Sequence, residues 1–276
     1  MDEHYNIAGI HIKLTGDALP LREALEVFKC EPVEKPDTAI RVFSKPLNIE
    51  PVYNYTEGRK RWGKLNDGRK VLSFSGMDAA ISPDWSEIEA YVHPALFTKM
   101  RFMNPFMELL FYNTCLLHKS IVLHAAAIEY NGGGIVVSAP AGTGKSTHCD
   151  LWTENYGAEY INGDRPLLRI VGDEPVVCGT AWSGTASIYK NVRVPLTAII
   201  FIEQHPENII EKLDIVPALQ KMIPRCFLPY HDRDFMALAM DNVEAVITRA
   251  DCYLLKCTPD LEAAELVKKC ITANKK

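Results

Sequence analysis

The sequence predicts an α+β protein of the mixed α/β kind. A small β-rich domain over residues 1–100 precedes a domain over residues 101–276, which is built on a mixed β-sheet with flanking helices. Two observations lead to this fold class. The first part of the chain consists of short extended runs separated by Gly, Pro, Asn and Asp turns. The second part combines a hairpin with strand–helix crossovers, which argues against a purely parallel, doubly wound sheet.

The extended runs of the N-terminal domain predict strands at residues 7–14, 39–43, 52–55, 71–74 and 88–92. Helical spacing of apolar residues predicts one helix over residues 21–30. A basic cluster fits a solvated hairpin better than a ligand site; it consists of Arg59, Lys60, Arg61 and Lys64. We identify no catalytic constellation in this domain.

The second domain is expected to open with a buried helix over residues 103–117, capped by Asn104 with Pro105 in its first turn. A strand over residues 121–130, a tight turn at residues 131–134 and a strand over residues 135–138 then form a hairpin. Further strands are expected at residues 159–162, 166–171, 196–203 and 252–257. Helices are expected near residues 216–223 and after Thr258-Pro259-Asp260.

Bulk composition limits the classes of function. A net charge of −5 gives no general attraction for nucleic acid or anionic membranes, so neither is expected as a partner. The eight cysteines are scattered without a C-x-x-C pair, which fits a reduced, cytoplasmic protein without a structural metal. The sequence shows no secretory signal and no apolar run of about twenty residues, so no membrane span is expected.

Residues 138–148, which read SAPAGTGKSTH, stand between an apolar run and a helix-like run. Gly142 and Gly144 permit backbone conformations in which successive N–H groups converge on an anion at a helix N-terminus. Lys145 would reach the outer phosphates of a nucleotide and the Ser146 hydroxyl would bind Mg²⁺. Ala139 replaces the first glycine of the usual phosphate-loop pattern. A glycine-rich turn that binds nothing would not explain the Lys-Ser-Thr run.

Four segments together resemble the HPr kinase/phosphorylase and phosphoenolpyruvate carboxykinase superfamily. They are the Leu-His-Ala-Ala segment at residues 123–126, the hairpin glycines, the loop at residues 141–147, and Asn-Gly-Asp-Arg at residues 162–165. The likeness covers residues 118–271. It implies a phosphoenolpyruvate-carboxykinase-like phosphate-loop core, with a mixed β-sheet and outer helices, that binds ATP and Mg²⁺. The residues expected to bind the nucleotide are Ala141, Gly142, Thr143, Gly144, Lys145, Ser146 and Thr147.

The resemblance also assigns roles outside the loop. His124 matches a histidine that approaches the transferring phosphoryl group, and Asp164 matches a carboxylate that holds the metal together with Ser146. Lys145 and Arg165 are the nearest cations for the charge that develops during transfer.

Gly163 stands where the family's serine kinases carry the aspartate that acts as general base. The base is therefore left open between His124, Asp164 and a carboxylate from elsewhere, such as Asp232 or Asp234. The signature Glu-x-Arg-Gly-x-Gly is absent, so HPr is not the expected substrate. In its place, residues 179–185 either cover the acceptor site or form a structural turn anchored by Trp182. Phosphoenolpyruvate carboxykinases themselves are roughly twice this length, so we do not expect this chain to be one of them.

These residues predict an enzyme, an ATP-dependent kinase that transfers the γ-phosphoryl group to a hydroxyl. The acceptor would be a Ser or Thr of a peptide or protein, or a small metabolite. Two alternatives share the site: a nucleotide-binding adaptor without catalysis, and a phosphorylase or phosphatase that acts on phosphoserine. The sequence leaves the acceptor undetermined and a homo-oligomer open.

Overall fold

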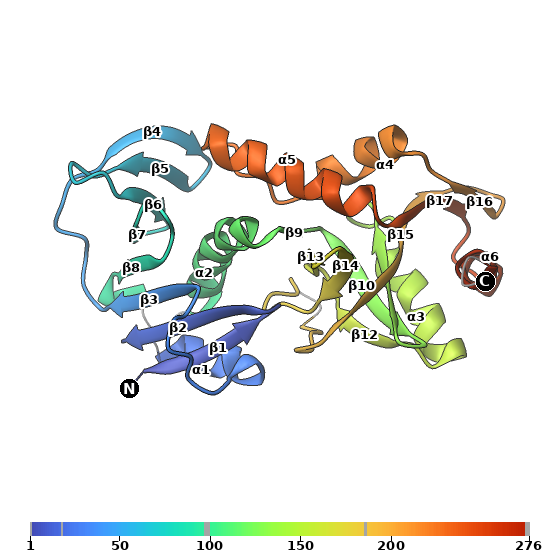
Figure 1. Ribbon diagram of the computed structural model, residues 1–276, viewed down its shortest axis with the longest axis horizontal. Helices are drawn as coiled ribbons and strands as arrows, with labels where there is room; N and C mark the ends of the chain where they lie inside the picture. Colours follow the sequence, from blue (N-terminus) through green and yellow to red (C-terminus); the bar gives the residue numbers. More distant parts are fainter. Residues whose placement is uncertain (1, 18, 97–99, 185–186, 274–276) are drawn as a thin grey trace. The chain divides into compact units, whose positions relative to one another are not determined.

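The computed structural model describes residues 2–17, 19–96, 100–184 and 187–273. Over these residues the protein has six α-helices and two mixed β-sheets, which is a mixed α/β architecture (Figure 1). The chain forms two compact units. The first comprises Met1–Cys115 and Pro229–Arg233, and the second comprises Leu116–Leu228 and Asp234–Lys276. The first unit thus extends past residue 100, where the sequence analysis ended the N-terminal domain, and it takes in a later segment.

The first unit is built on a sheet of eight strands in the order β1-β2-β3-β8-β7-β6-β5-β4. Strand β3 is parallel to both of its neighbours and the other pairs are antiparallel. The strands are β1 (Glu3–Ile7), β2 (Ile10–Gly16), β3 (Thr38–Phe43), β4 (Val52–Glu57), β5 (Lys60–Lys64), β6 (Lys70–Phe74), β7 (Met77–Ile81) and β8 (Glu87–Val92), and the helices are α1 (Leu19–Leu25) and α2 (Met100–Thr114).

Two details of this unit correct the sequence analysis. The run expected as one strand over residues 7–14 is a hairpin, because Ala8 and Gly9 both adopt positive φ and turn the chain between β1 and β2. Helix α2 begins at Met100, so Asn104 does not cap it and Pro105 lies inside it. Strands β5 and β7 were not expected, and the basic cluster lies on the β4–β5 hairpin.

The second unit contains a sheet of nine strands. Seven follow the order β12-β10-β11-β15-β14-β13-β9, while β17 pairs with β15 and β16. The strands are β9 (Ser120–Val122), β10 (Ala125–Tyr130), β11 (Gly133–Ser138), β12 (Glu159–Asn162), β13 (Leu167–Val171), β14 (Glu174–Cys178), β15 (Arg193–Gln204), β16 (Ile209–Lys212) and β17 (Asp251–Cys257), and the helices are α3 (Lys145–Tyr156), α4 (Ile215–Met222), α5 (Arg233–Ile247) and α6 (Leu261–Ala273).

Strands β11, β15 and β17 run parallel, and their carboxyl ends lie at one edge of the sheet. Buried residues of β10, β11, β15 and β17 pack against Cys149 and Trp152 of α3 and against Ala263 and Val267 of α6. This core holds the start of α3 at the end of β11. The chain reverses between β10 and β11 through Asn131 and Gly132, both at positive φ, as the hairpin signal predicted.

The expected strand over residues 121–130 is interrupted. Strand β9 pairs with β13 and strand β10 pairs with β12, and Leu123 and His124 lie between the two pairings. Helix α5 and strands β14 and β16 were not expected from the sequence. No helix among the described residues has the length and apolar character needed to cross a membrane.

Candidate functional site

The loop of residues 139–144 joins the end of β11 to the start of α3. Strand β11 is buried along its whole length. Gly142 and Gly144 have φ values of 77° and 116°, and a Cβ added to either would meet no atom within 4 Å. Glycine is therefore suited to these positions by backbone conformation and not by lack of space. The Thr143 N–H donates to the Pro140 carbonyl at 3.3 Å, which closes the loop.

The N-terminus of α3 has the properties of an anion site. The first N–H groups of a helix lack partners within the helix, and no side chain caps this end at Gly144. Together with the helix dipole, these groups favour an anion in front of the helix. The side chains of Ser146 and Thr147 are exposed at this end, whereas that of Lys145 is buried.

Helix α3 is fixed from behind by buried side chains. The Trp152 indole donates from Nε1 to Nε2 of His148 at 3.2 Å, so this imidazole acts as an acceptor inside the protein. Burial lowers the pKa of His148 to about 4, which keeps the ring neutral near pH 7. The Tyr160 hydroxyl on β12 lies 2.7 Å from Oδ1 of Asp150 and ties the first turns of α3 to the sheet.

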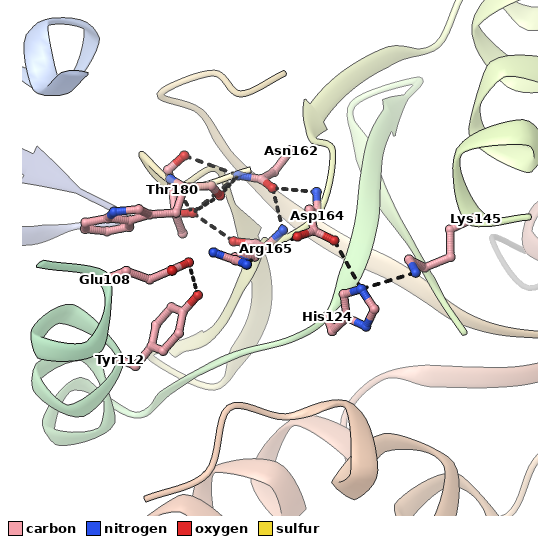
Figure 2. Close-up of polar contacts among 9 residues, drawn as sticks. Glu108, Tyr112, His124, Lys145, Asn162, Asp164, Arg165 and Thr180 are labelled. Carbon is pink, nitrogen blue, oxygen red and sulfur yellow. Dashed lines mark hydrogen bonds and ion pairs between the residues drawn. The ribbon is translucent and has the colours of Figure 1, made fainter. Parts of the chain in front are cut away.

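Lys145 lies at one end of a chain of polar contacts that runs through His124 to Asp164 (Figure 2). Its Nζ donates to the carbonyl of Ala139 at 3.2 Å and lies 3.4 Å from Nε2 of His124. Burial lowers the pKa of this ammonium group, and the charge of Arg225 adds to that effect, whereas the charge of Asp164 opposes it. Lys145 is thus a partly desolvated cation, of the kind that interacts strongly with an incoming phosphate.

His124 lies at the interruption between β9 and β10. Its N–H donates to the Arg225 carbonyl at 2.8 Å, and its own carbonyl accepts the Ser138 hydroxyl at 3.1 Å. These backbone bonds lie outside the regular sheet pairing and fix the residue between the end of β11 and the segment that follows α4. Its imidazole Nε2 lies 3.2 Å from Oδ1 of Asp164 (Figure 2).

Asp164 and Arg165 follow the end of β12. Oδ2 of Asp164 lies 3.2 Å from Nε of Arg165, so this carboxylate contacts both His124 and Arg165. Burial raises the pKa of Asp164, but the hydrogen bond from His124 and the charge of Arg165 outweigh it, and the net shift is downward. The carboxylate is therefore ionised at neutral pH. The Arg165 guanidinium also lies over the Phe227 ring, 5.6 Å from its centroid.

A cavity of about 350 Å³ joins the loop to this cluster. It is lined by His124, Ala141, Gly142, Gly144, Lys145, Ser146, Thr147, Gly163 and Asp164. The residues singled out from the sequence thus surround one space, with two exceptions. Thr143 lines a neighbouring cavity, and Arg165 lies behind Asp164. The other two carboxylates considered as a base do not line it; Asp232 belongs to the first unit, where it pairs with Lys70 at 2.7 Å.

A second cavity of about 550 Å³ lies on the other side of the loop. It shares Gly142, Gly144 and Thr147 with the first cavity, and its remaining lining comes from Thr143, His148, Leu151, Ile202, Gln204, His205, Pro206, Cys257, Thr258 and Pro259. Its walls come from the carboxyl ends of β15 and β17, where an α/β sheet commonly binds ligands. The sequence carries no signal for this cavity, because it forms only where the strand order places these ends beside the loop of residues 139–144.

Asn162 and Gly184 are also part of the site. In the sequence Asn162 stands out only as the first residue of Asn-Gly-Asp-Arg, yet its fully buried side chain forms hydrogen bonds to two segments of the site. A Cβ added to Gly184 would lie 2.3 Å from Oδ2 of Asp164, so the backbone of Gly184 contacts this carboxylate closely. Gly184 belongs to the segment at residues 179–185, and Asn162 bonds to it. Thr185 lies outside the described residues.

No protein-family model matches the chain, and no curated protein matches it. A search of solved structures finds the Hpr(Ser) kinase/phosphatase from Coxiella burnetii. That structure is 10% identical, its match covers 56% of this chain and 95% of that chain, and the TM-score is 0.31. This is a distant similarity, so the function must be inferred from the chain's own residues.

Proposed function

We propose that this protein is an ATP-dependent kinase that binds MgATP at the start of α3 and transfers the γ-phosphoryl group to a hydroxyl acceptor. One observation carries the proposal. The phosphate loop, Lys145 and Ser146 line the same 350 Å³ cavity as His124 and Asp164, which come from the opposite wall. Cations, hydroxyls and an ionised carboxylate around one helix N-terminus are the groups that phosphoryl transfer requires.

The residues present fit a magnesium ion. Ser146 supplies a hydroxyl and Asp164 an ionised carboxylate, and both line the cavity next to Lys145. Mg²⁺ prefers oxygen ligands and is commonly held by only one or two protein groups, with phosphates and waters completing the shell. When bound, the ion would neutralise charge on the phosphates. Arg165 and His124 would keep the Asp164 carboxylate oriented toward it.

The second cavity is suited to the nucleoside. It borders the loop at Gly142, Gly144 and Thr147, so a nucleotide with its phosphates in the first cavity can extend into it. Leu151 and Ile202 provide apolar wall, and the Gln204 amide, which lies 3.4 Å from the Thr143 carbonyl, provides a polar group at the rim.

The acceptor hydroxyl would have to approach the γ-phosphate from the side of His124 and Asp164. Of the candidates for general base, these two line the cavity. A loose transition state needs little help from a base, so positioning and charge neutralisation by Lys145, which lines the cavity, would supply most of the rate enhancement, while Arg165 acts through its contact with Asp164.

Titration calorimetry of the full chain with ATP, with and without MgCl₂, tests the proposal. Lys145→Ala should abolish ATP binding. Asp164→Asn should keep ATP binding without magnesium but lose the gain in ATP affinity that MgCl₂ produces. It should also lose phosphoryl transfer. Lys190→Ala removes an exposed lysine that pairs with Glu159, and it serves as the control that should change neither. Absence of ATP uptake by the unmodified protein would rule out the kinase.

Gly163 favours a second candidate, a nucleotide-binding adaptor without phosphotransfer. This residue lines the cavity, and its N–H donates to the Ile188 carbonyl at 2.9 Å, but it carries no carboxylate. The adaptor should show ATP-dependent thermal stabilisation without transfer to any hydroxyl acceptor. Gly163→Asp separates the two functions. A degenerate kinase should gain ATP turnover, whereas a kinase that works with one carboxylate should lose it or remain unchanged.

A further inference from the structure

Asn162 ends strand β12, and its side chain is fully buried. Its Oδ1 accepts two consecutive backbone N–H groups, from Asp164 at 3.0 Å and from Arg165 at 2.7 Å (Figure 2). A side-chain oxygen that accepts the N–H groups two and three residues later imposes a tight turn on the chain. This turn carries the chain out of the sheet and directs Asp164 toward His124.

The other end of the same amide bonds to a different segment. Nδ2 of Asn162 donates to the carbonyl oxygens of Thr180 at 3.2 Å and of Trp182 at 3.0 Å. The Thr180 hydroxyl in turn donates to the Arg165 carbonyl at 2.8 Å. Thr180 is 1% exposed and Trp182 is 8% exposed, so these bonds lie inside the protein and are not screened by water.

The segment Thr180–Gly184, which the Asn162 amide holds at Thr180 and Trp182, contacts the Asp164 carboxylate at Gly184. Gly184 adopts φ +57°, and a Cβ there would fall 2.3 Å from Oδ2 of Asp164. Asp164 is therefore constrained from two sides. The turn at Asn162 fixes its backbone, and the backbone of Gly184 limits where its carboxylate can move.

We propose that Asn162 is a positioning residue, which aims the Asp164 carboxylate into the phosphate cavity and couples it to the segment Thr180–Gly184. The inference rests on the proposed function, because the carboxylate is taken as the magnesium ligand. Asn162 lines neither of the two cavities described above. Its role is to hold the ligand, and removal of such outer partners typically lowers metal affinity by roughly 10- to 100-fold.

Three substitutions separate the two sets of hydrogen bonds that Asn162 makes, those accepted by Oδ1 and those donated by Nδ2. Asn162→Ala removes both sets. Asn162→Asp keeps an oxygen for the Asp164 and Arg165 N–H groups but places a carboxylate oxygen against the carbonyls of Thr180 and Trp182. Thr180→Val keeps the side-chain shape and removes only the hydroxyl. Asn155→Ala serves as the control, because the amide of this exposed residue bonds within α3, to the Leu151 carbonyl at 2.8 Å.

The first measurement is amide hydrogen exchange on the full chain without nucleotide. Asn162→Ala should speed exchange at Asp164 and Arg165 by about tenfold or more, since both N–H groups lose their acceptor. Asn162→Asp should leave these two amides protected and should speed exchange at Trp182, whose N–H bonds to the Thr180 hydroxyl. Unchanged exchange at Asp164 and Arg165 in Asn162→Ala would overturn the inference, whatever the protein binds.

The second measurement is the magnesium dependence of ATP binding. Asn162→Ala should lower the affinity for Mg²⁺ in the ternary complex by roughly 10- to 100-fold and leave Mg-free ATP binding unchanged. Asn162→Asp and Thr180→Val should show smaller losses, and they carry the test if Asn162→Ala does not fold. Equal loss of thermal stability in all variants with an unchanged magnesium dependence would reduce Asn162 to a packing role. Failure of the unmodified protein to bind ATP would instead count against the kinase, because the exchange result does not depend on nucleotide.

Discussion

Gly184→Ala places one methyl group against the carboxylate on which the proposed site depends. The new Cβ would lie 2.3 Å from Oδ2 of Asp164 and 2.9 Å from its Cγ. Cβ atoms essentially never lie within 3.0 Å of another atom and ordinary contacts begin at 3.4 Å, so the oxygen or the glycine backbone must move by about 0.7 to 1.1 Å. A movement of the carboxylate would break its 3.2 Å contact with Arg165 or with His124.

Two costs follow from this substitution. A non-glycine residue at positive φ loses roughly 1–2 kcal/mol of stability for its backbone conformation alone. The displaced carboxylate adds a functional cost, since a misplacement of about 1 Å in a catalytic group can lower the rate by on the order of 100-fold. We therefore expect magnesium-dependent ATP binding to weaken by roughly 10- to 100-fold.

Gly172→Ala is the matched control for this change. Gly172 has φ +63° in the same unit, and a Cβ there would meet no atom within 4 Å, so only the backbone cost applies. Both variants should lower Tm by roughly 2–4 °C per kcal/mol, but only Gly184→Ala should weaken the Mg²⁺ titration of ATP binding. The reasoning is refuted if the two variants behave alike in thermal unfolding and in calorimetry.

Three further predictions test other parts of the structure. His231 stacks on Trp62 at 3.6 Å between ring centroids, and burial lowers its pKa to about 4. As the pH falls, the unfolded state therefore takes up this proton before the folded state does. Denaturant titrations should show the free energy of unfolding decreasing as the pH is lowered from about 6.5 to 4, with a smaller decrease in His231→Phe. Leu151→Trp should fill the second cavity, lowering ATP affinity in calorimetry by about tenfold while leaving inorganic tripolyphosphate binding unchanged. Asn242→Ala should cost about 1–3 kcal/mol in denaturant unfolding, because the carbonyls of Leu116 and Ser120 lose a buried donor.

The glycine-rich turn between β11 and α3 was predictable from sequence because its signals are local. Gly142, Gly144, Lys145 and Ser146 are neighbours in the chain, and the strand before them and the helix after them carry their own signals. The mixed sheet was also predicted, since the Asn-Gly turn after β10 indicates a hairpin in a chain that otherwise has crossovers. Local signals were sufficient for these features.

Other features depend on contacts between distant segments, which local patterns do not encode. Residues 121–130 are mostly apolar and contain no Gly or Pro, yet β9 ends at Val122 because the pairing partner changes from β13 to β12. The second cavity required the order β11-β15-β17, which brings Gln204 and Cys257 beside the loop. Helix α2 extends upstream of Pro105 because Met103 and Phe106 are buried on one face, and this packing outweighs the capping signal at Asn104.

Two segments outside the regular strands bring His124 and Asp164 to the first cavity: residues 123–124 between β9 and β10, and residues 163–166 between β12 and β13. The Leu123 N–H donates to the Pro166 carbonyl and the Ala125 N–H donates to the Asp164 carbonyl, both at 3.1 Å, so the two irregular segments bond to each other on either side of His124. Side chains at His124 and Asp164 therefore face one space through backbone bonds that do not depend on their chemistry. Gly163 carries no carboxylate, and these backbone bonds do not need one. Gly163→Asp should therefore leave the framework in place, so that a gain of ATP turnover without a change in ATP binding would identify the proposed degenerate kinase.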